Sequence, residues 1–212
     1  DITNYVSLDL CRPLHVYDVA KLKGDINVRE GKQGEEFDAL NDKSYILDGG
    51  EVAITDESGL LGLGGIVGGE STGTDEDTTD VFLECAYFEP SRIAKTGRLH
   101  SIDSDARYRF ERGVEPVFTY EGMEIATRLI LDICGGEASE VVEAGSLPNW
   151  EKTVEYDPSI VKNLIGMDVE TNRQKEILEN LGFSVTDKKD WFDVSVPPWR
   201  QDIWAADTDG RA

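Results

Sequence analysis

The chain has 212 residues, of which 39% are hydrophobic, and this is enough for one large domain or for a medium domain with a small one. Its 43 acidic residues outnumber its 21 basic ones, and the formal net charge of −22 argues against a general nucleic-acid-binding surface. No apolar run approaches the roughly 20 residues that cross a bilayer, and three separated cysteines with two histidines argue against a metal site, so we expect a cytoplasmic protein with reduced thiols.

The first 147 residues contain helical and strand-like segments in mixed order. Apolar spacing predicts a helix over residues 1–10, and PLHVYD is then expected to form a turn that enters a second short helix. Between residues 25 and 87 the period shortens, and turn residues separate the predicted strands INV, YIL, EVAITD, LLGLGGIVGG and VFLECAY. EPSRIAKTGR is again helical, and the longest predicted helix runs from about Pro116 to Cys134.

A change of composition at SLPNWEK predicts a linker, and a smaller domain follows it. YDPSIVKNLIG and TNRQKEILENLG are predicted helices, the second begun by a capping box of Thr171 and Gln174 and ended by Gly182. FSVTDKKDWFDVSVPPW predicts a two-stranded hairpin. We therefore predict an α+β fold, with a mixed-sheet domain over residues 1–147 and a winged-helix-like domain over residues 148–212. The final WAADTDGRA shows no packing pattern and is expected to fray, or to belong to an element that continues beyond it.

One carboxylate lies inside an apolar stretch, DVFLECAYF at residues 80–88. In a strand, alternate residues of this stretch point to opposite faces, and both faces are apolar, so we expect the strand to be buried on both sides. An unpaired buried carboxylate costs several kcal/mol, so Glu84 must find a partner or take up a proton. An ion pair with a nearby arginine is one explanation, and the recognition of a ligand is another.

The segment LGLGGIVGGESTG is rich in glycine but does not form a phosphate loop, because no GK[ST] follows it. Its glycines allow another group to approach the backbone closely, and a glycine-rich bend in a sheet is the alternative. A second distinctive segment is basic: from Arg92 to Arg112 the sequence contains six basic residues and only three acidic ones. This local excess either holds an anionic partner or forms ordinary ion pairs with the acidic surface.

Five segments, taken together and in this order, resemble the bacterial phenylalanyl-tRNA synthetase beta subunit: DITNYVSLDLCRPLHVYD, GGIVGGESTG, EDTTDVFLECAYFEP, SDARYRFERGVEP and PPWRQDI. The likeness extends from Asp1 to about Ile203. It implies an internal fragment of that subunit, with the tRNA-editing (B3/B4-like) domain, lacking its N-terminal part, followed by the small helix-wing (B5-like) domain.

The resemblance implies that the fragment hydrolyses tyrosine that has been attached in error to the phenylalanine tRNA. Glu84 matches the family's glutamate that binds the tyrosine hydroxyl, which would explain a carboxylate in an apolar strand. The implied catalytic positions are His15, Thr3 and Asn4. The implied substrate-binding positions are Gly65, Gly68, Ser104, Ala106 and Pro13, with serine at 104 where the family often has threonine. The implied RNA-contacting positions are Arg92, Lys95, Arg98, Arg107 and Arg109.

Other roles remain open for several of these residues. His15 has no evident Asp or Ser partner in the sequence and is also explained as a structural histidine, while Thr3 and Asn4 could cap the first helix. The resemblance implies as partners the phenylalanine tRNA, the remaining beta-subunit domains and the alpha subunit. It implies no cofactor in this fragment, since ATP and Mg²⁺ serve only the whole synthetase. A non-catalytic, structural or RNA-contacting scaffold is the alternative function, and a free-standing deacylase is a third.

Overall fold

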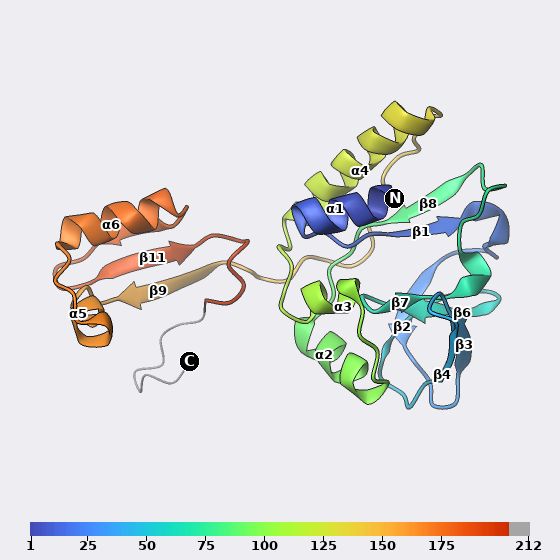
Figure 1. The fold of residues 1–212 in the computed structure, drawn as a ribbon, viewed down its shortest axis with the longest axis horizontal. Coiled ribbons are helices and arrows are strands. Elements are labelled where there is room, and N and C mark those ends of the chain that lie inside the picture. The colour runs from blue at the N-terminus through green and yellow to red at the C-terminus, as the bar shows by residue number, and fades with distance from the viewer. Residues whose placement is uncertain (204–212) are drawn as a thin grey trace. The chain divides into compact units, whose positions relative to one another are not determined.

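The computed structural model describes residues 1–203 and divides into two compact units, Asp1–Leu147 and Pro148–Ala212 (Figure 1). Each unit has a hydrophobic core of its own. The predicted fraying of residues 204–212 lies outside the described residues. None of the helices in the described part of the chain is long and apolar enough to cross a membrane. The α+β fold class is confirmed.

The strands of the first unit form one four-stranded sheet and two two-stranded sheets, all antiparallel. The larger sheet has the order β2 (Asn27–Glu30), β5 (Val52–Asp56), β6 (Gly59–Leu63) and β7 (Val67–Gly68). The smaller sheets pair β3 (Glu36–Ala39) with β4 (Lys43–Ile46), and β1 (His15–Asp18) with β8 (Val81–Glu84). The β1–β8 pair joins distant parts of the sequence, and the glycine-rich segment supplies the end of β6 and the whole of β7.

The helices of the first unit are α1 (Ile2–Leu10), α2 (Pro90–Leu99), α3 (Asp105–Phe110) and α4 (Phe118–Cys134), with 3-10 turns η1 (Val19–Lys21) and η2 (Glu70–Thr72). The carboxylate of Glu89 accepts backbone N–H groups at the start of α2, and the Ser104 hydroxyl does the same for α3. Gly135, with φ of 75°, follows the last turn of α4. Figure 1 shows α1 lying along α4, and the two helices are in contact.

The core of the first unit joins the sheets to α2 and α3. Tyr17, Leu47 and Leu61 from the strand-rich part and Ile93 and Phe110 from the two helices are all buried in one cluster. Burying each such side chain contributes about 1.5–3 kcal/mol relative to leaving it exposed. This cluster surrounds the glycine-rich segment and fixes it against α3.

Two predictions about the first unit are wrong. PLHVYD is not a turn: residues 15–18 form β1, because Val16 and Tyr17 pair in register with Leu83 and Phe82 of β8, and the short helix expected after it is only the 3-10 turn η1. The strand predicted over residues 80–88 ends at Glu84 and is not buried on both sides. Val81 and Phe82 point to opposite faces and are 41% and 42% exposed, because the outer half of this two-stranded sheet is uncovered on both faces.

The second unit consists of β9 (Lys152–Tyr156), α5 (Ser159–Ile165), α6 (Thr171–Asn180), β10 (Ser184–Asp187) and β11 (Phe192–Val196). The predicted hairpin is confirmed, since β10 pairs with β11 in an antiparallel register, and β9 completes a sheet of order β10-β11-β9. The rings of Tyr156 and Phe192 stack with centroids 6.1 Å apart in the core. All four tryptophans of the chain lie after residue 147.

The predicted capping box of α6 is wrong. The N-cap is Glu170, and no side chain caps the helix. The side chain of Gln174 is instead buried. Its amide nitrogen donates hydrogen bonds to the carbonyls of Pro158 and Val169, and its oxygen accepts one from the phenol of Tyr156. The Gln174 side chain thus reaches back to the carbonyl just before the N-cap instead of to the backbone N–H of Thr171 that a capping box requires.

Candidate functional site

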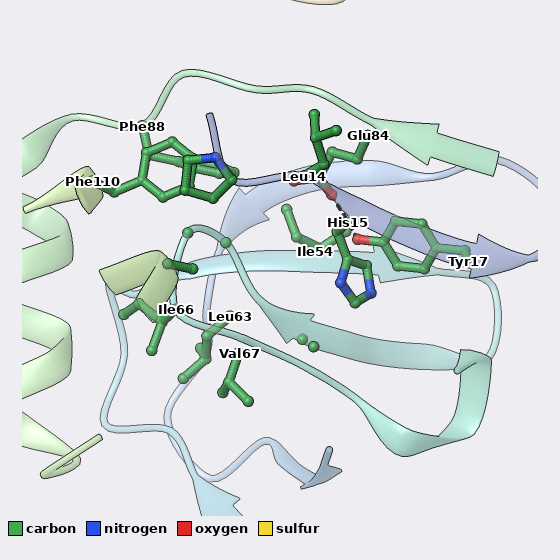
Figure 2. A pocket seen from close by; sticks show the side chains of 16 residues that line it. Leu14, His15, Tyr17, Ile54, Leu63, Ile66, Val67, Glu84, Phe88 and Phe110 are labelled. Atoms are coloured by element: carbon green, nitrogen blue, oxygen red, sulfur yellow. Dashed lines mark hydrogen bonds between the residues drawn. The ribbon is translucent and has the colours of Figure 1, made fainter. Parts of the chain in front are cut away.

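A cavity of about 100 Å³ opens in the first unit between β1, β8, the glycine-rich segment and α3 (Figure 2). Engineered cavities of about 150 Å³ accept benzene, so this space is of the order that one aromatic ring requires. Most of its wall is apolar side chain or glycine backbone, and its polar side chains are those of His15, Tyr17 and Glu84. The lining residues are Pro13, Leu14, His15, Tyr17, Ile54, residues 62–68, Glu84, Phe88, Ala106 and Phe110. Such apolar walls with few convergent polar groups are typical of ligand sites.

Glu84 lies at the end of β8 and has found an internal partner. The phenol of Tyr17 donates a hydrogen bond to Glu84 Oε2 at 2.7 Å. Burial raises the pKa of Glu84, and the Tyr17 hydrogen bond opposes that rise. No arginine or lysine among residues 1–203 forms an ion pair with Glu84. The arginine-pairing explanation for this carboxylate is therefore wrong.

His15 stands directly opposite Glu84 in the register of β1 and β8. Its ring meets that of Tyr17 edge-on, with centroids 4.4 Å apart. Burial lowers the pKa of His15 from 6.5 to about 4, so its imidazole is neutral at neutral pH. The buried Nε2 atom has no hydrogen-bond partner within the described chain. Because this nitrogen is buried, a polar group of a ligand or a water molecule reaches it only where the ring or the glycine backbone beside it shifts.

The glycines of the segment 62–68 are required by close approach. A Cβ atom on Gly68 would lie 2.2 Å from Cε1 of His15, and Gly65 has a φ of +69° that disfavours any other residue. Ser104 fixes the same segment, because its hydroxyl donates to the Ile66 carbonyl at 2.7 Å. The backbone wall of the cavity is therefore held from both sides, by His15 and by the start of α3.

Comparison with known families separates the two units. The model of the B3/4 domain matches residues 1–135, more than half of the chain. The chain belongs to the B3/4 domain family. In the second unit, the model of the tRNA synthetase B5 domain matches residues 154–206.

The B3/4 domain and the unit that follows it are similar to curated phenylalanine–tRNA ligase beta subunits. The subunit of Paramagnetospirillum magneticum is 53% identical over 97% of this chain, and that of Cereibacter sphaeroides is 50% identical over 96%. The chain spans about a quarter of these relatives, 26% and 25% of their lengths. The predicted resemblance to an internal part of this subunit is confirmed. An N-terminal fragment of the synthetase beta subunit from Pyrococcus horikoshii is 17% identical, covers 96% of this chain and 60% of its own, and has a TM-score of 0.42, too low to carry an argument.

The predicted site residues of the B3/4 domain are only partly brought together. Those that line the cavity are Pro13, His15, Gly65, Gly68, Glu84 and Ala106. Ser104 lies behind the glycine segment rather than at the cavity surface. Thr3 and Asn4 lie within α1, away from the lining, and do not cap that helix, whose N-cap is Asp1.

Sequence reasoning missed Tyr17 and the apolar wall of the site. The sequence did contain an indication of Tyr17: His15 precedes it by two residues, and in a strand residues two apart point to the same face. It was lost because residues 15–18 were not predicted to be a strand. The aromatic part of the wall consists of Phe88 and Phe110. No local sequence pattern indicates that their two segments come together at the cavity.

The predicted RNA-contacting residues of the B3/4 domain divide into two groups. Arg107 pairs with Glu111 at 2.9 Å, Arg109 with Asp105 at 3.1 Å, and Arg92 with Glu30 at 3.1 Å. For these three the ion-pair explanation agrees with the structure. Lys95 and Arg98 are exposed and form no ion pair within residues 1–203.

Neither a cysteine nucleophile nor a metal site is indicated in the described residues. Burial raises the pKa of the Cys85 thiol to about 11, and its Sγ is hydrogen-bonded to the Thr119 carbonyl, so it is a poor nucleophile. In the part of the chain that the structure describes, no group of three or more His, Cys, Asp or Glu side chains could hold a metal ion.

Proposed function

We propose that the chain is part of a phenylalanine–tRNA ligase beta subunit in which the cavity hydrolyses tyrosine attached in error to the phenylalanine tRNA. The observation that carries the proposal is the Glu84 carboxylate at the wall of an apolar cavity of about 100 Å³, opposite the neutral His15. The names of the relatives supply the substrate class, since they are phenylalanine–tRNA ligase subunits.

Glu84 would recognise the side chain rather than perform the chemistry. Tyrosine exceeds phenylalanine by one hydroxyl, so a cavity that admits tyrosine cannot exclude phenylalanine by size. A phenylalanine ring offers no donor to the carboxylate oxygen that would accept the phenol O–H, and sites built to bond a hydroxyl reject the analogue that lacks it by roughly 10⁴–10⁵-fold. The correct product is thereby spared.

Hydrolysis requires water to attack the ester carbonyl carbon, after which the bond to the ribose oxygen breaks and that oxygen takes up the proton. The unpaired Nε2 of His15 would hold the water or the neighbouring ribose hydroxyl. Backbone N–H groups of the glycine-rich segment would stabilise the oxyanion. Thr3 and Asn4 would take part only where the end of the tRNA also contacts α1.

The wider setting belongs to the same proposal. The whole protein would be a cytoplasmic ligase for protein biosynthesis, assembled from the remaining beta-subunit domains and an alpha subunit, and would bind tRNA. ATP and Mg²⁺ would act at the aminoacylation site, which these residues do not contain, and the cavity itself would need no cofactor.

The test uses the full-length synthetase with Glu84→Gln and Glu84→Ala. Deacylation of tyrosyl-tRNA and of phenylalanyl-tRNA, both on the phenylalanine tRNA, gives a ratio of kcat/KM for the two esters. We expect the wild type to prefer the tyrosyl ester, and both variants to lower that ratio by about tenfold or more, because an interaction with a charged group is lost. Glu36→Gln, an exposed carboxylate on β3, is the control.

Two outcomes would contradict the proposal. A wild type that hydrolyses neither ester would favour the scaffold alternative. Equal hydrolysis of the two esters by the wild type would show that Glu84 does not read the hydroxyl.

A further inference from the structure

Tyr17 is a polar residue of the cavity to which the family resemblance gives no role. Its side chain is 2% exposed, and its phenol donates to Glu84 Oε2 at 2.7 Å. Within residues 1–203 no other hydrogen bond reaches the Glu84 carboxylate. The carboxylate that the proposed function assigns to a substrate phenol is therefore already bonded to a phenol of the protein (Figure 2).

The sheet register makes this contact a fixed one. His15 lies opposite Glu84, and Tyr17, two residues further along β1, lies on the same face in the diagonal position. The Tyr17 ring meets the His15 ring at 4.4 Å and the Phe82 ring at 6.0 Å between centroids. Neighbours on both strands thus hold the ring, and its hydroxyl cannot leave Glu84 without disturbing them.

We infer that Tyr17 is a positioning residue for substrate recognition, which holds one oxygen of Glu84 so that the other, Oε1, accepts the hydroxyl of the ligand. The inference rests on the proposed function and deepens it. A carboxylate has room for about four hydrogen bonds, so a second phenol does not have to displace the first. The site would then bind tyrosine through a carboxylate shared between a phenol of the protein and a phenol of the substrate.

Two physical effects follow from this arrangement. A glutamate held in one conformation loses less freedom when the ligand binds, so the interaction is stronger than with a mobile side chain. The Tyr17 hydrogen bond also favours the charged form of Glu84, against the burial that raises the pKa of this carboxyl group. Among residues 1–203 the titratable groups next to Glu84 are His15 and Tyr17 on β1 and Cys85 on its own chain segment, and no lysine or arginine forms an ion pair with it.

The experiment compares the full-length synthetase with its Tyr17→Phe variant, which keeps the ring and removes the hydroxyl. We expect the preference for the tyrosyl ester over the phenylalanyl ester to fall by about tenfold, chiefly through a higher KM for the tyrosyl ester. In the wild type the preference is lost as the pH falls through the pKa of Glu84. In Tyr17→Phe that pKa is higher, so the loss sets in at a higher pH.

Two further variants separate positioning from general structural damage. Tyr156→Phe removes a phenol that bonds Gln174 at the same 2.7 Å in the second unit, and it should leave both the preference and its pH dependence unchanged. In a Glu84→Ala background, Tyr17→Phe should have no further effect on the preference, because the residue through which it acts is gone. A purely structural role for Tyr17 would lower the melting temperature without moving the pH profile.

The outcomes distinguish this inference from the proposed function. A wild type that prefers the tyrosyl ester, together with an unchanged Tyr17→Phe variant, would overturn the role of Tyr17 and leave the hydrolysis proposal standing. A stronger tyrosine preference in Tyr17→Phe would also overturn it, since the protein's phenol would then compete with the substrate. A wild type that hydrolyses the two esters equally would overturn both the proposed function and the role of Tyr17.

Discussion

His15 and Glu84 face each other across two strands, and burial acts on both of them. It lowers the pKa of the imidazole to about 4 and raises that of the carboxyl, because in each case the charged form is the one that loses hydration. The pair is therefore not an ion pair of the usual kind. It consists of a neutral ring with an unpaired nitrogen and an acid whose raised pKa is partly offset by the hydrogen bond from Tyr17.

The depressed pKa of His15 predicts a pH dependence of stability. The unfolded chain binds a proton to this histidine below pH 6.5, whereas the folded chain does so only below about 4. The stability that the neutral ring provides is thus complete above pH 6.5 and is lost as the pH falls towards 4, by up to about 3 kcal/mol. Urea unfolding of the wild type and of His15→Gln across this range should show a difference in free energy that changes with pH. A constant difference would contradict the shift.

At the scale of elements, regular periodicity was sufficient for the long helices and for several of the short strands, but not for all of them. The predicted helices over residues 1–10, in EPSRIAKTGR and from about Pro116 correspond to α1, α2 and α4. The missed elements, β1, β3, β9 and α3, have four to six residues. Such short elements are set by tertiary pairing rather than by local pattern.

The same limit explains which part of the site could be predicted. Glu84 could be recognised because the apolar residues on either side of it in the sequence already mark a carboxylate at this position as unusual. Tyr17 could not, because its partner lies 67 residues further along the chain and only the β1–β8 register brings the two together. The roles of the lining residues rest on the family resemblance and stay predictions.

Gln174 connects three elements of the second unit and gives a prediction at this scale. Its side chain bonds Tyr156 of β9 and the carbonyls of Pro158 and Val169, which precede α5 and α6. Gln174→Ala would leave these partly buried groups without their partner and a space where the buried side chain was, so we expect a loss of about 2–4 kcal/mol in the free energy of unfolding. Arg173→Ala, next to it on the exposed side, should change stability by less than about 0.5 kcal/mol. Chemical denaturation measures both, and equal effects would show that the buried bonds matter little.

For the whole molecule, the dominant physical fact is the net charge of −22. An acidic surface repels an RNA chain over most of its area, which restricts any approach of tRNA to places where basic groups such as Lys95 and Arg98 are exposed. The rest of a relative's length, about three-quarters, is outside this chain. Tight binding of tRNA by these residues alone is therefore not expected.

Self-repulsion of this charge predicts a stability that depends on salt. Between about 10 mM and 500 mM sodium chloride we expect the melting temperature to rise by several degrees, because screening weakens the repulsion. A variant with Glu137→Lys and Glu140→Lys, both exposed, should show a shallower rise. A melting temperature that does not respond to salt, or responds equally in the two proteins, would contradict this explanation.

The placement of the tryptophans has a practical consequence. Because all four follow residue 147, indole emission reports on the second unit, while the cavity is surrounded by tyrosine, phenylalanine and histidine rings that do not emit in that band. Excitation selective for indole therefore follows the unfolding of the second unit separately from that of the first.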